Sequence, residues 1–182
     1  MGLDKRIGSR FLRAGPAYGG SCFPKDTKAI TTTGDKFKTD LSVIKNVIKS
    51  NQNRSSLLLR RTFKLLNGKV SNKKICFLGV TFKANTDDMR DSSSLSMIPS
   101  LVKKGAKVNY YDPTGEKKEF RNLKNVKYSN SVKSAIKNSD LIIIHTEWND
   151  FKTINFKKNV LNKKFILFDM RNIYSPQKMK EL

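Results

Sequence analysis

No run of apolar residues in the sequence approaches the length of a membrane-spanning helix, and the first residues lack the apolar stretch of a secretory signal. Only two cysteines are present, Cys22 and Cys76, and their sequence contexts are very different. A structural disulfide is therefore not expected. These absences predict a chain of the reducing cytoplasm with no membrane partner.

Acidic residues are scarce, because 15 Asp and Glu stand against 37 Lys and Arg, which gives a formal charge of +22. Such an excess is typical of nucleic-acid-binding proteins. However, the lysines are spread along the whole chain, and no DNA- or RNA-binding motif is present. We therefore expect no nucleic-acid partner, and a basic surface that favours an anionic substrate. A salt-dependent gel shift would revive the nucleic-acid alternative.

A glycine-rich loop that ends in a thiol carries the most chemical information, and it reads Gly15-Pro16-Ala17-Tyr18-Gly19-Gly20-Ser21-Cys22-Phe23-Pro24-Lys25-Asp26. Pro24 is acceptable in the first turn of a helix, so Cys22 is expected at a loop-to-helix junction. The helix dipole and Lys25 both favour a thiolate there, and a thiolate can attack a carbonyl. Asp26 is the candidate to orient or activate water; its alternative role is N-cap of the helix, and the two roles are compatible. The alternative for Cys22 is a small packed residue in a tight turn.

The first third of the chain predicts helices. Residues 27–38 start as a helix that breaks at Thr31–Gly34. From Asp40 onward, apolar residues recur at three- and four-residue spacing until Gly68. This pattern predicts one helix of about seven turns, with Asp40 as N-cap and Gly68 as C′ residue.

The rest of the chain alternates short apolar strands with helical segments. Strands are expected at 74–80, 108–111, 126–128, 141–144 and 165–168, and helices at 95–104, 132–137 and 150–161. This alternation predicts a Rossmann-like, doubly wound α/β domain with a parallel sheet. Because ligands of such sheets bind beyond the carboxyl ends of the strands, the polar clusters at 81–92, 145–148 and 169–172 should share one edge.

Three residues in these clusters suit a nucleotide ligand. Phe82 and Lys83 offer a flat ring and a cation for a base or sugar and its phosphate, and Arg90 could grip a second phosphate. Three nearby carboxylates are interpreted as helix-start residues and partners of Arg90, so no metal site is predicted: Asp87, Asp88 and Asp91.

Two reactive residue types are given structural roles. His145 is the only histidine, and it follows an apolar strand. Nothing in the sequence pairs it with Cys22. Cys76 lies inside a strand that reads as buried on both faces. Neither is expected to take part in chemistry.

The sequence resembles the nucleotide-sugar dehydrogenases of the UDP-glucose/GDP-mannose dehydrogenase family. Gly-Gly-Ser-Cys-Phe-Pro-Lys-Asp, at 19–26, is similar to the catalytic loop of that family, and Phe-Lys-x-x-Thr-Asp-Asp-x-Arg-x-Ser, at 82–92, is similar to its UDP-binding signature. Residues 146–148 and 168–174 also match, but Met170 replaces the usual glycine, which leaves the role of Arg171 open. In the family, a long helix joins two domains and carries much of the dimer contact.

The resemblance implies roles for individual residues. It implies catalytic roles for Cys22 and Asp26, and contacts with NAD for Lys25 and Arg90. Contacts with the UDP-sugar are implied for Phe11, Leu12, Arg13, Ala14, Gly15, Gly19, Phe82 and Lys83, and for Arg6 across a subunit boundary. For Arg6 the alternative is plain surface charge. The resemblance also implies a homodimer or a higher homo-oligomer.

The activity that the resemblance implies is an NAD-dependent, four-electron oxidation of UDP-glucose to UDP-glucuronate, through a thiohemiacetal and a thioester of Cys22. A dehydrogenase of GDP-mannose or a UDP-N-acetylhexosamine is the nearest alternative, and a non-catalytic UDP-binding module is another. The family's Gly-x-Gly-x-x-Gly fingerprint and its catalytic lysine are missing from the 182 residues. The chain is therefore expected to be a carboxyl-terminal portion without turnover of its own. Residues 1–68 would form a central, dimerising segment, and 69–182 a UDP-sugar-binding domain.

Overall fold

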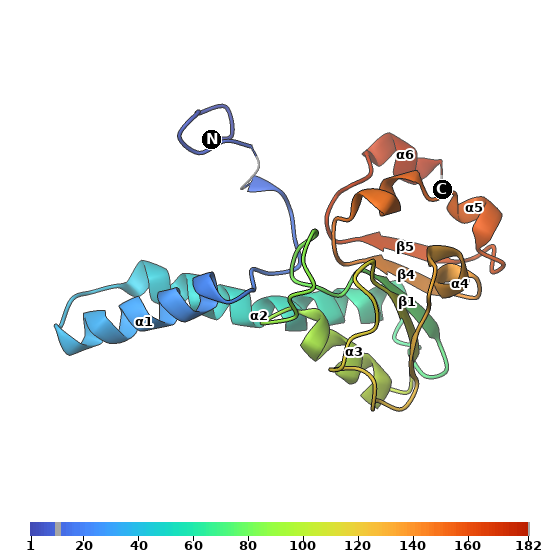
Figure 1. Ribbon diagram of the computed structural model, residues 1–182, viewed down its shortest axis with the longest axis horizontal. Coiled ribbons are helices and arrows are strands. Elements are labelled where there is room, and N and C mark those ends of the chain that lie inside the picture. Colours follow the sequence, from blue (N-terminus) through green and yellow to red (C-terminus); the bar gives the residue numbers. More distant parts are fainter. Residues whose placement is uncertain (10–11, 182) are drawn as a thin grey trace.

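A helical hairpin projects from a domain built on a parallel sheet (Figure 1). The computed structural model describes residues 1–9 and 12–181. The amino-terminal end stands away from the sheet, and the segment approaches the sheet edge before it enters the first helix (Figure 1). Within the described residues no helix is both long and apolar enough to cross a membrane.

The hairpin consists of α1 (Cys22–Lys36) and α2 (Ser42–Leu65). The predicted break at Thr31–Gly34 is wrong, because α1 runs straight through it. Hydroxyls of the threonine run donate to the carbonyl of Lys28 within the helix. Gly34 is buried against Leu41, where a Cβ would lie 2.5 Å from a Leu41 methyl carbon. The glycine therefore serves close helix packing and does not end the helix.

The predicted long helix is confirmed, but both of its ends shift by a residue. The Asp40 carboxylate accepts from the first helical amide at 2.9 Å, although Leu41 occupies the N-cap position. At the other end Asn67, with φ of 50°, takes the C′ position that was predicted for Gly68. The Gly68 amide donates back to the carbonyl of Phe63 at 2.8 Å, as in a Schellman motif.

Five parallel strands form the sheet in the order β3-β2-β1-β4-β5, which confirms the predicted Rossmann-like topology. The strands are β1 (Lys74–Leu78), β2 (Lys107–Tyr111), β3 (Val126–Tyr128), β4 (Leu141–Ile144) and β5 (Ile166–Asp169). Each predicted strand is present, with ends that move by two residues at most. Because all five run the same way, their carboxyl ends meet at one edge.

Alternate residues of the central strands feed two cores, one on each face of the sheet. Ile75 and Phe77 of β1 face the core that includes α2 and α3 (Ser94–Lys103). Cys76 and Leu78 face the other core, with α4 (Val132–Ile136) and the segment around Phe151 and Phe156. The result is the three-layer arrangement of a doubly wound domain.

The segment after β4 is less regular than predicted. Two short pieces replace the helix expected at 150–161, namely the 3₁₀-helix η2 (Asn149–Thr153) and α5 (Phe156–Asn159). The backbone is extended at Ile154, and the Asn155 side chain starts α5 by accepting from the Lys158 amide. The chain then closes with α6 (Pro176–Lys180), a helix that the sequence pattern did not predict.

Candidate functional site

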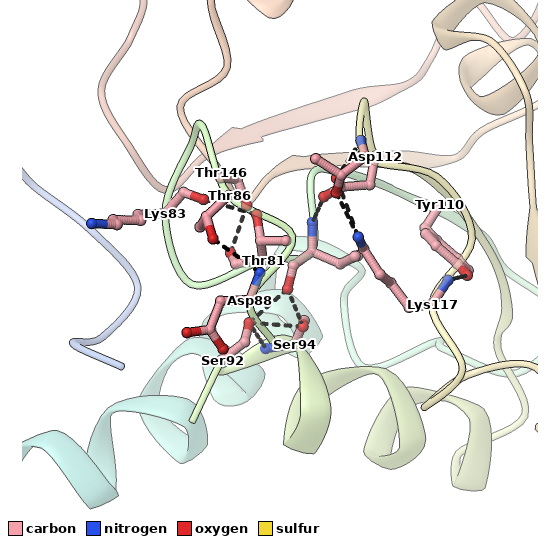
Figure 2. Close-up of polar contacts among 12 residues, drawn as sticks. Thr81, Lys83, Thr86, Asp88, Ser92, Ser94, Tyr110, Asp112, Lys117 and Thr146 are labelled. Atoms are coloured by element: carbon pink, nitrogen blue, oxygen red, sulfur yellow. Dashed lines mark hydrogen bonds and ion pairs between the residues drawn. The ribbon is translucent and has the colours of Figure 1, made fainter. Parts of the chain in front are cut away.

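The polar clusters that follow β1, β4 and β5 meet at the carboxyl edge of the sheet, as predicted. The Thr146 hydroxyl donates to the carbonyl of Thr81 at 2.8 Å (Figure 2). Arg171 donates to the carbonyl of Phe82 at 2.7 Å and to that of His145 at 2.9 Å. Three strand ends are thereby tied together around the loop that carries Phe82 and Lys83.

Cys22 is the first residue of α1 and is exposed, which confirms the predicted loop-to-helix junction. Its sulfur lies 3.6 Å from the Ser21 hydroxyl, and Pro24 is buried in the first turn. Cys76 differs in every respect, since it is fully buried in β1 and burial raises the pKa of its thiol. The alternative of a packed turn residue is therefore wrong for Cys22.

Two glycines place the Cys22 loop directly on the Phe82 loop. The Gly20 amide donates to the carbonyl of Arg90 at 2.7 Å, and its φ is 84°. A Cβ on Gly20 would lie 2.7 Å from the Phe82 ring, and one on Gly19 would lie 2.7 Å from the carbonyl oxygen of Asp91. Only glycines allow this close approach. Cys22, the first residue of α1, therefore follows the contact with Phe82 by two residues.

We expect Gly20→Ala to destabilise the chain by about 1–3 kcal/mol more than Gly115→Ala, because the added methyl forces the Phe82 ring to move. Gly115 is a matched control, since its φ is 90° and nothing lies within 4 Å of a Cβ placed there. Both variants share the strain of an alanine at positive φ. Urea unfolding of the two variants measures the difference, and equal losses would contradict the packing of Gly20 on Phe82.

Helix α2 holds the earlier part of the Cys22 loop through two polar residues. The Asn51 side chain accepts from the Tyr18 amide at 3.0 Å and donates to the Tyr18 carbonyl at 3.1 Å. Arg54 donates to the carbonyl of Gly15 at 3.3 Å. Sequence reasoning missed both residues, because a polar side chain on a helix gives no sign of which distant backbone it will bind.

Arg171, which follows β5, contacts the Cys22 loop as well as the Phe82 loop. Its Nη1 lies so close to Gly15 that a Cβ on that residue would be only 2.7 Å away. Its Nε lies 3.0 Å from a Glu147 oxygen, but the single Nε hydrogen points to His145, so Glu147 pairs with it by charge alone. Burial lowers the pKa of Arg171, and Glu147 opposes that shift. Met170 is buried in the core and is not at positive φ, so the backbone at this position does not require a glycine.

Phe82 and Lys83 present a ring and a cation at this edge. The Lys83 ammonium lies 5.3 Å from the centroid of the half-buried Phe82 ring. The Lys83 side chain is exposed and points away from the hydrogen-bonded cluster (Figure 2). A free cation beside a flat apolar surface can hold a phosphate and stack a planar or sugar ring.

Arg90 forms the predicted pair with a neighbouring carboxylate. Its guanidinium binds Asp88 through two bonds, of 3.0 and 2.8 Å, and remains exposed. This bond lowers the pKa of Asp88 and raises the pKa of Arg90, to which the charge of Cys22 adds a smaller part. Arg90 therefore lies within electrostatic reach of the thiol.

Lys25 and Asp26 lie on α1 just beyond Cys22. Their charged atoms are 3.4 Å apart and both side chains are exposed. Asp26 stands in the second turn and Ser21 holds the N-cap position, so the alternative of Asp26 as N-cap is wrong. An exposed carboxylate one turn from the sulfur remains available to orient water.

The amino-terminal residues stand apart from this edge. Arg6 is exposed and binds Asp4 at 2.7 Å, which fits the surface-charge alternative within a single chain. Leu12, Arg13 and Ala14 are exposed, and Phe11 lies outside the described residues. A cavity of about 340 Å³ also opens between α1, α2 and the start of α3, but neither Cys22 nor Lys83 lines it.

His145 is fully buried and has the structural role that was expected. Its Nε2 lies 2.8 Å from the Ser93 hydroxyl and its Nδ1 lies 3.2 Å from the Thr146 hydroxyl. The Thr146 hydrogen is already donated to Thr81, so Nδ1 must be the nitrogen that carries the proton. Burial, and then the charge of Arg171, lower the pKa of His145 to about 3.

We expect this buried imidazole to make the fold sensitive to acid. The native chain keeps His145 neutral, whereas the unfolded chain takes up a proton below its ordinary pKa of 6.5. Stability is therefore complete above that pH and falls by about 1.4 kcal/mol per pH unit toward pH 3. Urea unfolding at pH 7 and pH 4.5 should show a loss that is about 2 kcal/mol smaller in His145→Asn. An unchanged pH dependence in the variant would contradict this role.

Comparisons with known proteins cover nearly the whole chain. The family model described as "UDP-glucose/GDP-mannose dehydrogenase family, UDP binding domain" matches residues 76–176, and the model for the central domain of the same family matches residues 1–53. A UDP-glucose 6-dehydrogenase of Rickettsia conorii is 41% identical over 185 residues, which cover 100% of this chain and 43% of that protein. UDP-glucose 6-dehydrogenase YwqF of Bacillus subtilis is 40% identical over 96% of this chain and 40% of its own length.

A solved structure agrees with these matches. A UDP-glucose dehydrogenase from Pyrobaculum islandicum superposes with a TM-score of 0.83 at 29% identity, over 99% of this chain and 40% of that chain. The chain thus spans less than half the length of the relatives that it matches.

Proposed function

Since this chain belongs to the UDP-glucose/GDP-mannose dehydrogenase family, we propose that it supplies the nucleophilic thiol and the UDP-binding edge of an NAD-dependent UDP-glucose 6-dehydrogenase. One observation carries the proposal. Gly19 and Gly20 pack against the Phe82 loop, so an exposed thiol and an exposed lysine flank one surface. Such a surface suits a substrate that has an anionic tail and a reactive carbon a few bonds away.

The UDP moiety would lie along the carboxyl edge. Lys83 would bind a phosphate oxygen, and the Phe82 ring would form an apolar wall for the nucleotide sugar. Gly15 and Gly19 would line the same path, because side chains there would meet Arg171 or the backbone of Asp91. Leu12, Arg13 and Ala14, with Phe11, would approach from the preceding segment.

Cys22 would carry the covalent chemistry. Oxidation of the C6 alcohol removes a hydride and a proton and leaves an aldehyde. The Cys22 sulfur then bonds to the aldehyde carbon and forms a thiohemiacetal. Loss of a second hydride and a proton gives a thioester, which water cleaves to the carboxylate and the free thiol. Asp26, exposed one turn away, would orient that water.

The chain has residues that fit part of an NAD site. When bound, NAD accepts the hydride of each oxidation. Lys25 and Arg90 are exposed cations near Cys22, and they could bind the phosphates of the dinucleotide. The 182 residues hold no Gly-x-Gly-x-x-Gly after a strand, so these two side chains would make only some of its contacts.

The helical hairpin supports an assembly of more than one chain. Apolar side chains stand exposed along α1 and α2, among them Phe23, Ile30, Phe37, Val43 and Val47. We assign residues 1–68 to a central, dimerising segment and 69–182 to the UDP-sugar-binding domain. The partner is a second copy in which Arg6 reaches the neighbouring substrate. Both cysteines are free thiols, as suits a reducing cytoplasm.

Calorimetric titration of the chain with UDP-glucose and with GDP-mannose tests the proposed substrate. We expect binding of UDP-glucose and of UDP itself, with weaker binding of GDP-mannose, and no NADH production from this chain with UDP-glucose and NAD. Tighter binding of GDP-mannose, or of a UDP-N-acetylhexosamine, would instead support the nearest alternatives. UDP binding by a chain whose Cys22 does not react with thiol reagents would indicate a non-catalytic module.

A further inference from the structure

A buried carboxylate stands behind the loop that carries Phe82 and Lys83. Asp112 is fully buried at the carboxyl end of β2 (Figure 2). One of its oxygens accepts from the Val80 amide at 2.9 Å. The other accepts from the Thr114 amide at 3.0 Å and from the Thr114 hydroxyl at 2.6 Å. Both oxygens are therefore committed to holding backbone, and neither is free for a ligand.

Asp112 has a counter-ion that is almost as buried as itself. The Lys117 ammonium lies 3.8 Å from Asp112, and their side chains are 6% and 0% exposed. The Lys117 amide donates to the Tyr110 hydroxyl at 2.8 Å, which anchors the turn that brings the lysine back. Because a buried charge is costly unless it is paired, Lys117 compensates the buried carboxylate and helps to fix it in place.

The loop in front of Asp112 is held at every carbonyl from Val80 to Lys83. The Ser92 and Ser94 hydroxyls each donate to the Val80 carbonyl at 2.6 Å. The carbonyls of Thr81 and Phe82 accept from the strand-end side chains already described, and that of Lys83 accepts from the Thr81 hydroxyl at 2.9 Å. Asp112 adds the restraint on the Val80 amide, which fixes the first peptide of the loop.

We propose that Asp112 is a positioning residue for the UDP-binding loop and acts through the Val80 amide on the placement of Phe82 and Lys83. This role rests on the proposed function, because it supposes that Lys83 binds the diphosphate. A restrained loop presents the Lys83 ammonium in one place before the ligand arrives, so less ordering is left for binding to supply. Lys117 supports this role indirectly, because it pairs with Asp112.

The opposite end of β1 provides a matched control. Asp140 accepts from the Lys74 amide at 2.8 Å, and the Lys73 ammonium lies 3.8 Å from its other oxygen. An aspartate thus restrains each end of β1 through one backbone amide, with a lysine at the same separation. Only the carboxyl end of β1 adjoins the Phe82 loop, so a positioning role predicts that Asp112 alone affects UDP binding. A purely structural role predicts similar effects of Asp112 and Asp140.

The test compares Asp112→Asn with Asp140→Asn by calorimetric titration with UDP. A side-chain amide offers one acceptor oxygen in place of two, so the Asp112→Asn variant cannot hold both the Val80 and the Thr114 amides. We expect Asp112→Asn to raise the Kd for UDP about tenfold, which is the scale of one lost restraint on a binding group. We expect Asp140→Asn to stay within about twofold, as for a site remote from the ligand. A wild-type Kd in Asp112→Asn, or equal increases in both variants, would overturn the role.

A double-mutant cycle with Lys83→Ala separates positioning from general stability. If Asp112 acts through Lys83, Asp112→Asn should change the Kd less than about twofold when Lys83 is already alanine. A full tenfold effect in that background would contradict the proposal. Thr114→Val removes the hydroxyl that donates to Asp112 and accepts from the Lys117 ammonium. We expect about a threefold rise in the Kd from it if Asp112→Asn does not fold.

Failure of the proposed function would give a different result. A wild-type chain that does not bind UDP would overturn that function and this role together. Wild-type binding that survives in Asp112→Asn would overturn the positioning role alone.

Discussion

The native chain should react with one equivalent of a disulfide reagent such as DTNB, and Cys22→Ala with none. Cys22 is exposed at the start of α1, whereas Cys76 is fully buried and burial raises the pKa of its thiol. Cys76 can react only when the sheet opens, which makes it about a thousandfold slower or more in a domain of ordinary stability. Absorbance at a fixed reagent concentration gives the two rates, and mass spectrometry assigns them.

Two controls make this result specific. Cys76→Ala should keep the fast equivalent, and the wild-type chain in guanidinium should show both. Two thiols that react at similar rates in the native state would mean that β1 is not the closed, central strand described above. No fast thiol at all would mean that Cys22 is covered, and the proposed nucleophile would be lost.

Lys83→Ala should weaken UDP binding by about tenfold to a hundredfold, because a hydrogen bond to a charged group contributes about 1.5–3 kcal/mol. The Lys83 ammonium is exposed and lies over the Phe82 ring, so little of the fold depends on it. Its removal should leave the unfolding free energy almost unchanged. Calorimetric titration at fixed ionic strength measures the loss in affinity.

Because the chain is strongly basic, the Lys83 variant needs a control in which another exposed lysine is removed. With a net charge of +22, the chain attracts any anion weakly, and each lost lysine reduces that attraction. Lys104 is exposed just after α3, which returns the chain to the amino ends of the strands, so Lys104→Ala measures the general effect. Equal losses from the two variants would show that Lys83 contributes charge alone and holds no specific position.

Local pattern was enough to predict the sheet. Continuous apolar strands such as 141–144 can be buried only when both faces are covered, and their alternation with helices leaves few topologies. The threonine run at 31–33 misled the same reasoning, because their hydroxyls bond within α1. The tertiary contact of Gly34 with Leu41 explains why a glycine sits inside that helix.

The site was predicted where its chemistry is local in sequence. The junction of loop and helix at Cys22 follows from glycines on one side and a proline on the other. What positions that loop could not be predicted, because Asn51, Arg54 and Arg171 act on backbone that is far away along the chain. Polar side chains of this kind look like ordinary surface until the fold brings their partners to them.

The closeness of Cys22 to a bound diphosphate is tested most directly by affinity labelling. A UDP molecule that carries a haloacetamide in place of the sugar should alkylate Cys22 about a hundredfold faster than free iodoacetamide at equal micromolar concentration, since a bound reagent reaches an effective concentration in the millimolar range. Excess UDP should abolish the acceleration, and Lys83→Ala should lose it. Labelling of wild-type Cys22 at the rate of free iodoacetamide, unaffected by UDP, would contradict a single site shared by the thiol and the Phe82–Lys83 loop.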